Sequence, residues 1–259
     1  MRTEVRCSGP WLRIRPVDPR DALLERLDAA RFALVVAAHD GQHRDPAHSL
    51  CLACVEVLGI AGAGLVLTSG VRSLDFIGVS DGVSEAVEQM EYTLGEGPCV
   101  TAFRTRQPVF DSDLADEGPD RWPEFRRGAL AAGVYAAFGF PLLIEQICIG
   151  ALNLYHDRAG DLSEDQVADA LVVAKFAGRS VLSWQAEAPP GTLAWQLEVA
   201  PRNRVEVHQA VGRISVQVGV SLEDALVLLR AYAFSHDRPI SDVAAEVAAG
   251  RLRLDSGDS

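Results

Sequence analysis

Apolar residues return every third or fourth position in several parts of this chain, and this spacing predicts amphipathic helices. Four segments before the first proline pair show it: 21–38, 49–60, 83–91 and 163–185. The last of them has a clear start signal, because Ser163 and Gln166 form an S-x-x-Q capping box. Its apolar stripe is long enough to pack on a sheet or against a second copy of itself.

Between these helices the apolar runs become short and are bounded by turns, which predicts strands. Five segments have this pattern: 62–69, 73–80, 108–113, 134–143 and 147–157. Two pairs are joined by short turns, which favours an antiparallel sheet over a doubly wound parallel one. The proline at the start of 108–113 makes that segment an edge strand. The expected fold class is therefore α+β, with a central antiparallel sheet and flanking helices.

Pro189-Pro190-Gly191 ends the long helix and marks a domain boundary. After a short helical piece, three further amphipathic helices follow at 202–219, 222–235 and 240–249, with Gly250 stopping the third. A three-helix bundle of this size is feasible. The expected organisation is an arm at 1–20, a larger domain at 21–186, a proline-interrupted linker at 187–201, a bundle at 202–254 and a tail at 255–259.

Composition narrows the class of protein. Of 259 residues, 48% are hydrophobic and 23% charged, which fits a globular chain. The net charge of −12 argues against binding to nucleic acid through overall charge, but residues 191–254 carry seven basic and seven acidic groups and are neutral. No apolar run has the length of a membrane span, and the first residues lack a signal-peptide core. We expect a cytoplasmic protein with reduced cysteines and no membrane partner.

Two short motifs suggest chemistry but favour simpler interpretations. Residues 78–82 match the G-x-S-x-G elbow of hydrolases, but the chain lacks the alternating strands and helices of that fold, so we interpret them as a turn. His39, His43 and His48 share one loop with two aspartates, and a solvated loop is the default for such a cluster. We expect no metal site, no cofactor and no catalytic residue.

The cysteines leave an alternative open. Cys51 and Cys54 form a C-x-x-C pair on an apolar helix, where two buried thiols are the simpler interpretation. Cys99 stands just before a short predicted helix, and a helix N-terminus lowers the pKa of a thiol. A thiol redox enzyme or sensor using Cys99 with Cys51 or Cys54 is therefore one alternative function.

A collinear series of motifs carries a family resemblance. LGEGPC, DSDLAD, RWPEF, FPLL and IGALNLYH, within 94–156, resemble the GAF sensor domains of actinobacterial GAF–ANTAR proteins. Residues 203–252 are similar to the ANTAR domain. The resemblance implies an antiparallel GAF sheet, a three-helix RNA-binding bundle and a homodimer. It also implies an antiterminator that binds paired hairpins in nascent mRNA under control of a signal at the GAF domain.

The resemblance also suggests site residues. The expected RNA-binding residues are Arg204, Gln209, Ala210, Gly212, Arg213, Arg230, His236 and Arg238, with Ala210 and Gly212 allowing close approach. The expected ligand pocket lies between the sheet and the loops at 81–99 and 111–125, and its residues are Glu96, Cys99, Trp122, Phe125, Tyr135 and Phe138.

The chain departs from the family in ways that leave the input signal open. Lys175 is the one lysine, so the cyclic-nucleotide signature of some GAF domains is absent, and no cysteine precedes a histidine as in bilin-binding ones. A small-molecule or redox signal therefore stays unassigned. A dimerisation module without RNA activity is a further alternative.

Overall fold

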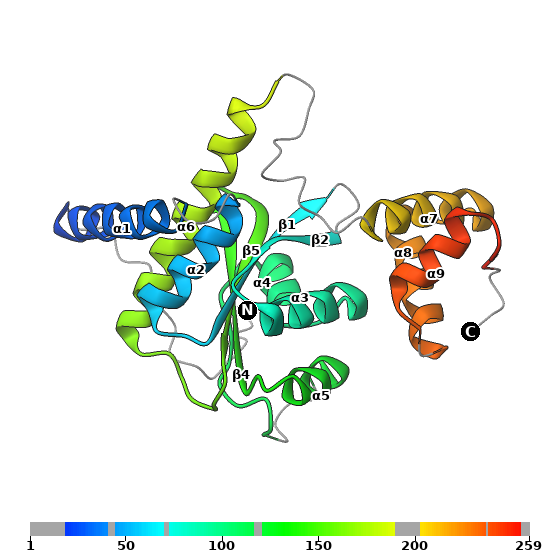
Figure 1. Cartoon of the computed structure of the whole chain (residues 1–259), viewed down its shortest axis with the longest axis horizontal. Helices are drawn as coiled ribbons and strands as arrows, with labels where there is room; N and C mark the ends of the chain where they lie inside the picture. The colour runs from blue at the N-terminus through cyan, green and yellow to red at the C-terminus, as the bar shows by residue number, and fades with distance from the viewer. Residues whose placement is uncertain are drawn as a thin grey trace, which may run out of the picture.

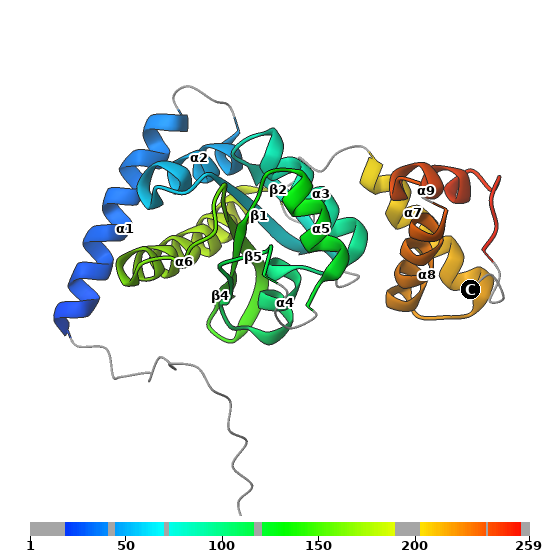
Figure 2. The ribbon, with the colours of Figure 1, turned by 90° about the horizontal axis from the view of Figure 1, so that it is seen from below.

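A computed structural model describes residues 19–40, 45–69, 73–116, 121–189, 203–236 and 238–254. In this part of the chain an α+β domain is followed by three helices (Figures 1 and 2). The fold class expected from the sequence is confirmed. Residues 1–18, most of the predicted linker and the tail at 255–259 lie outside the described residues.

The α+β domain is built on an antiparallel sheet of five described strands in the order β2-β1-β5-β4-β3. Their bounds are β1 Gly62–Ser69, β2 Ser73–Val79, β3 Val109–Asp111, β4 Ala136–Ile144 and β5 Ile147–His156. β4 and β5 form a hairpin around Glu145, whose φ of 55° is left-handed. β3 lies at the edge of the sheet, as its proline-led sequence predicts.

Helices cover both faces of this sheet. Figure 1 shows α2 (Pro46–Leu58) and α6 (Glu164–Glu187) on one face and α3 (Gly82–Leu94), α4 (Pro98–Thr105) and α5 (Pro123–Ala131) on the other. Successive strand residues point to opposite faces. Leu152 and Leu154 of β5 pack into the core under α2 and α6, while the side chains of Asn153 and Tyr155 reach α3.

The first face is held by apolar packing. α6 begins at the predicted capping box, in which the hydroxyl of Ser163 accepts the N–H of Gln166 and the Gln166 amide oxygen accepts the N–H of Ser163. Its stripe packs on the sheet, and Phe176 meets Phe32 of α1 (Pro19–Asp40) edge to face at 5.2 Å. None of the helices in the described part of the chain has the length and apolar character that crossing a bilayer requires.

α5 is the one described helix that the sequence reasoning missed. Its N-cap, Trp122, has a left-handed φ of 54° and makes no side-chain capping bond. The cap comes from another part of the chain, because the carboxylate of Glu96 accepts the N–H groups of Glu124 and Phe125 at 3.2 Å. Only the tertiary fold brings this carboxylate to the helix, so local spacing could not predict it.

The C-terminal bundle consists of α7 (Asn203–Val218), α8 (Leu222–Ser235) and α9 (Ile240–Ala248). The bundle matches the predicted one, and Gly250 follows α9 with a φ of 73° as its stop signal requires. The hydroxyl of Ser221 caps α8 by accepting the N–H of Asp224 at 3.0 Å.

Candidate functional site

A small cavity lies on the second face of the sheet, between α3, α4 and the strands β1 and β2. Glu88, Glu91 and Tyr92 of α3 line one side of it, and Val66 and Leu74 line the strand side. Its volume is about 20 Å³, which is roughly room for one water molecule. In this conformation the cavity is therefore nearly filled by the protein's own side chains.

Two carboxylates are buried beside this cavity. Glu88 and Glu91 are 2% and 3% exposed. The Asn153 side-chain N–H donates to both, at 2.9 Å to Glu88 Oε1 and 3.2 Å to Glu91 Oε2, and the Tyr155 hydroxyl donates to Glu88 at 2.8 Å. Burial, and then the neighbouring Glu88, raise the pKa of Glu91 well above its usual value. Such a pair tends to keep a proton that a solvated glutamate would lose.

The expected pocket residues separate into three groups. Cys99, Trp122 and Phe125 are buried on the second face, and Glu96 caps α5. Tyr135 is 42% exposed and does not line the small cavity. Phe138 is fully buried on the opposite face, in the core under α2 and α6, because β4 residues alternate between faces. The expectation that Tyr135 and Phe138 line the pocket is therefore corrected.

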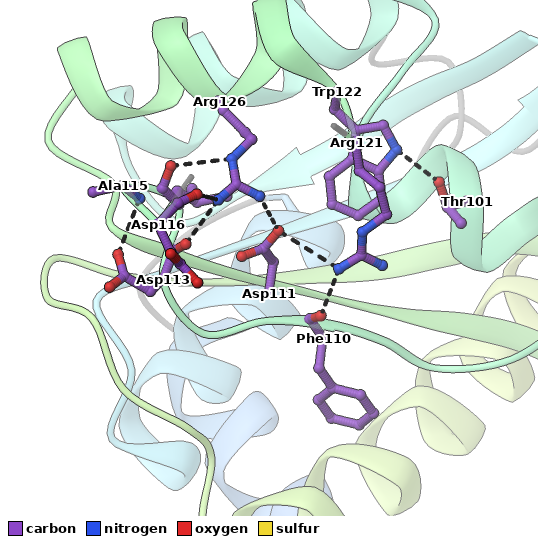
Figure 3. Close-up of polar contacts among 10 residues, drawn as sticks. Thr101, Phe110, Asp111, Asp113, Ala115, Asp116, Arg121, Trp122 and Arg126 are labelled. Atoms are coloured by element: carbon purple, nitrogen blue, oxygen red, sulfur yellow. Dashed lines mark hydrogen bonds and ion pairs between the residues drawn. The ribbon is translucent and has the colours of Figure 1, made fainter. Parts of the chain in front are cut away.

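The DSDLAD and RWPEF motifs form a structural clasp rather than a binding pocket (Figure 3). Arg126 donates to Asp111 Oδ2 at 2.7 Å and to the carbonyls of Leu114, Asp113 and Asp116. All of its guanidinium nitrogens are thus engaged within the loop. The motifs thus fasten residues 111–116 to the start of α5.

A second contact in Figure 3 ties the clasp to α4. The Trp122 ring N–H donates to the Thr101 hydroxyl at 3.1 Å, and the Arg121 guanidinium lies 4.9 Å from the Trp122 ring centroid. Burial raises the pKa of Asp111, and the positive charges of Arg126 and Arg121 oppose that shift.

The candidate thiols do not come together. Cys51 and Cys54 are fully buried in the core under α2, whereas Cys99 is buried on the other face of the sheet. Burial raises the pKa of all three thiols. A nucleophilic thiol needs the opposite shift, so this arrangement does not favour the redox alternative.

The remaining motifs have structural partners. Asp81, within the G-x-S-x-G match, caps α3 by accepting the N–H groups of Val83 and Ser84, and Ser80 is 8% exposed. His39 pairs with Glu56 at 3.0 Å, and a ring nitrogen of His48 lies 2.6 Å from the Val79 carbonyl. His43 lies outside the described residues.

In the bundle, the expected RNA-binding residues of α7 fall on two sides. Gln209 and Arg213 are exposed and one turn apart. Arg213 also donates to the Ala248 carbonyl at 2.9 Å, near the end of α9. Ala210 is fully buried in the bundle core, so its small side chain serves helix packing, and Gly212 is partly exposed. Arg204 lies in α7, but its side chain is outside the described part.

The expected residues near the end of α8 are held by neighbours. His236 is exposed and its ring stacks on Tyr232 at 3.9 Å. Arg238 makes a two-point ion pair with Glu246, at 2.9 and 3.1 Å. The stacked pair presents an aromatic surface, while Arg238 would have to exchange its partner to bind a phosphate.

Arg230 differs from all of these, because it contacts the sheet domain. Its Nη2 donates to the Tyr92 carbonyl at 2.5 Å, and its guanidinium lies 5.6 Å from the Tyr92 ring centroid. A Cβ on Gly95 would lie 2.5 Å from Nη1, so a larger residue there would displace the guanidinium. The expectation that Arg230 faces RNA is therefore not met in this conformation.

The buried setting of Arg230 is unfavourable for a cation. Burial, together with the like charge of Arg104, lowers the pKa of Arg230 to about 10. Its Nε is buried and has no hydrogen-bond partner among the described residues. A second contact between the domains, His208 of α7 to Asp75 of β2 at 3.8 Å, accompanies it.

Four residues of this region were missed from the sequence. They are Glu88, Glu91, Arg104 and Asn153. Glu88 and Glu91 lie three residues apart on the face of α3 that also buries Val87, and Asn153 interrupts an apolar strand. For Glu88, Glu91 and Asn153 the available signal was a polar residue at a core position, whereas Arg104 is exposed and gave no such signal.

Comparison with known proteins agrees with this architecture. The profile described as "GAF domain" matches residues 20–178, and the one described as "ANTAR domain" matches residues 195–247. Among curated proteins, none matches this chain.

Several solved structures are similar to this chain, two of them GAF domains. The GAF domain from an Acinetobacter phosphoenolpyruvate-protein phosphotransferase is 11% identical, with 63% of this chain and 96% of that chain covered and a TM-score of 0.48. The GAF domain from a phosphoenolpyruvate-protein phosphotransferase of Coxiella burnetii is 13% identical, with 64% and 98% covered and a TM-score of 0.46. A free methionine-R-sulfoxide reductase from Neisseria meningitidis is 18% identical, with 65% and 93% covered and a TM-score of 0.43.

The two profile matches define the domain combination. The GAF match covers the sheet and its helices, and the ANTAR match covers most of the three-helix bundle. GAF domains are sensor domains and ANTAR domains are RNA-binding antitermination domains, so the combination is that of a regulator. The chain belongs to the GAF domain family, and an ANTAR domain follows its GAF domain.

Proposed function

We propose that this protein is an RNA-binding transcription antiterminator. Its ANTAR bundle binds paired hairpins in a leader mRNA, and its GAF domain controls that binding. The observation that carries the proposal is the ANTAR match over a described three-helix bundle. A small molecule or redox change at the GAF domain is the input.

The exposed side chains of the bundle suit RNA loops. Gln209 and Arg213 offer hydrogen-bond donors side by side on α7. The His236–Tyr232 stack offers a flat surface for an unpaired base. Arg204 and Arg238 add positive charge that attracts the phosphate backbone of the RNA. Because residues 191–254 are neutral overall, we expect few phosphate contacts and a shallow salt dependence, equivalent to about two to four counterions.

The GAF domain exerts control through Arg230. In the conformation described, this guanidinium contacts Tyr92 and Gly95 of the GAF domain. If RNA binding needs the same guanidinium, the GAF domain and RNA compete for it. A signal molecule that binds the GAF domain then changes the RNA affinity. The change can be no larger than the ratio of that molecule's affinities for the two states, with Arg230 held by the GAF domain and with Arg230 released.

The test is binding to an RNA with two adjacent hairpins, at several salt concentrations. The controls are the same RNA with changed loop bases and duplex DNA. We expect loop-dependent binding that Arg213→Met weakens by about tenfold, as loss of a charged hydrogen bond would. Arg253→Met is the matched control, because Arg253 is also an exposed arginine of the bundle region. Equal binding to both RNAs would contradict the proposal.

Assembly and location are part of the same proposal. We expect a homodimer in the cytoplasm without a membrane partner. The dimerisation alternative predicts a stable dimer whose arginine face tolerates charge reversal. Arg213→Glu in the RNA assay, with sedimentation of the same sample, separates the two: loss of RNA binding in an intact dimer supports the antiterminator.

A further inference from the structure

A second, larger hollow, open to solvent, lies between the GAF and ANTAR domains next to the small cavity. This interdomain cleft has a volume of about 320 Å³, within the range of small-molecule sites. Its walls come from α3 and α4 of the GAF domain and from α8 of the bundle. We propose that it binds a small organic anion, with an apolar body and one carboxylate or phosphate head, between Arg104 and Arg230. The inference deepens the proposed function, because it names the input class of the sensor.

Two positive charges with spare donors stand at the cleft. Arg104 is exposed, and among the described residues it has no hydrogen bond or ion pair. Arg230 makes its bond to the Tyr92 carbonyl but leaves its buried Nε without an acceptor. Two guanidinium groups of like charge at one cleft favour an anion that accepts from both.

The carboxylates near the cleft do not already serve as that anion. Glu96 is engaged with the N–H groups at the start of α5. Glu124 pairs with Arg127. Glu91, in the inner cavity, accepts from Asn153 and from the Cys99 N–H. Each is committed elsewhere. The charge of Asp75 acts on Arg230, but Asp75 pairs with His208 at 3.8 Å, and among the described residues neither Arg104 nor Arg230 makes an ion pair.

Around Arg230, the α8 wall of the cleft is apolar. Val227, Ala231 and Phe234 recur along one side of α8, in the same stretch as Arg230, and Leu94 faces them from α3. Val227 is 57% exposed and Phe234 is 58% exposed, which is unusual for large apolar side chains. A ligand with an apolar body covers this wall while its head reaches the arginines.

Such a ligand would touch both domains at once. It would therefore favour the conformation in which α8 lies against the GAF domain. RNA that binds Arg230 favours the conformation in which this side chain has left the GAF domain. The anion and the RNA must therefore each lower the affinity for the other by the same factor.

The test is calorimetric titration of the full chain with benzoate and with phenyl phosphate. Benzamide is the neutral control, because it keeps the ring and loses the charge. We expect both anions to bind at least about tenfold more tightly than benzamide, since charged hydrogen bonds are stronger than neutral ones. The ratio between benzoate and phenyl phosphate identifies the preferred head group.

Variants locate the site. Arg104→Met should weaken anion binding about tenfold, and Phe234→Ala should weaken benzoate while leaving inorganic phosphate unchanged. Arg158→Met is the matched control, because Arg158 is exposed on the GAF domain and does not line the cleft. Circular dichroism checks that each variant is folded.

Several results would overturn the inference: no anion binding at 10 mM, equal binding of benzoate and benzamide, or equal losses in Arg104→Met and Arg158→Met. RNA binding measured without any anion is a separate readout. The proposal of an anion site in the cleft can therefore fail while the antiterminator proposal stands, and the reverse also holds.

Discussion

The two faces of the GAF sheet are packed in different ways. Under α2 and α6, Leu152, Leu154 and Phe140 belong to a core cluster of hydrophobic side chains. On the other face, the carboxylates of Glu88 and Glu91 are buried with Asn153. Burying such groups costs free energy unless they are hydrogen-bonded. The first face is packed with apolar side chains, and the second buries a hydrogen-bonded polar site next to the ANTAR domain.

Among the variants that test this comparison, Leu152→Ala should lower the free energy of unfolding the most. The side chain is fully buried on the apolar face, so its loss leaves a cavity. We expect the free energy of unfolding to fall by about 2–5 kcal/mol, measured by urea denaturation. Ile147→Ala, on the same strand but 68% exposed, should change it by less than about 0.5 kcal/mol. Equal losses would contradict the assignment of the faces.

Arg126→Met tests the polar clasp of the second face. The change removes the closer of the two arginines that pair with Asp111, which is 7% exposed, and leaves several loop carbonyls without that donor. We expect a loss of about 2–4 kcal/mol, also from urea denaturation. Arg127→Met is the control, because Arg127 is exposed and pairs only with Glu124 among the described contacts. A loss of unfolding free energy no larger than in the control would contradict a structural role for the clasp.

The buried carboxylate pair predicts an unusual pH dependence. The folded pKa of Glu91 is raised, so between its usual value and that raised value the folded state binds more protons than the unfolded state. The free energy of unfolding therefore falls as pH rises through this window, by at most about 1.4 kcal/mol per pH unit for one proton. Glu91→Gln should flatten the slope, measured by denaturation at a series of pH values. Glu85→Gln, on the exposed side of the same helix, should leave it unchanged.

Thiol labelling of the folded protein should show the smallest effect of these tests, because buried thiols should not react. In a Cys7→Ser, Cys148→Ser background, Cys51, Cys54 and Cys99 remain buried with raised pKa values. We expect no labelling of the folded protein at pH 8 within minutes, and complete labelling in urea. Rapid labelling of Cys99 in the folded protein would restore the redox alternative.

The apolar face of the sheet was predictable and the polar face was not, for a physical reason. Strand alternation and the Ser163–Gln166 box are local, so they follow from spacing alone. The cap of α5 by Glu96 joins residues 28 positions apart, and the contact of Arg230 with Tyr92 joins residues 138 positions apart. Periodicity carries no information about such pairs.

The site residues show the same limit. Tyr135 and Phe138 were expected in the pocket between the sheet and the loops, but strand alternation sends Phe138 to the other face. Glu88 and Glu91 were overlooked because charged residues in a helix are usually solvated. The exposed positions of Gln209, Arg213 and His236 agree with the bundle's polar pattern, while their contact with RNA stays a prediction.

The most direct test of GAF control is RNA affinity in Arg104→Glu compared with Arg158→Glu. Both variants make the same charge change on exposed arginines of the GAF domain. Of these two arginines, Arg104 lies near Arg230 and Arg158 does not. A glutamate at position 104 would therefore pair with Arg230 and hold the bundle against the GAF domain, and a glutamate at position 158 would not. We expect Arg104→Glu to weaken binding of the two-hairpin RNA roughly tenfold, with Arg158→Glu near wild type. Equal affinities in the two variants would contradict the account.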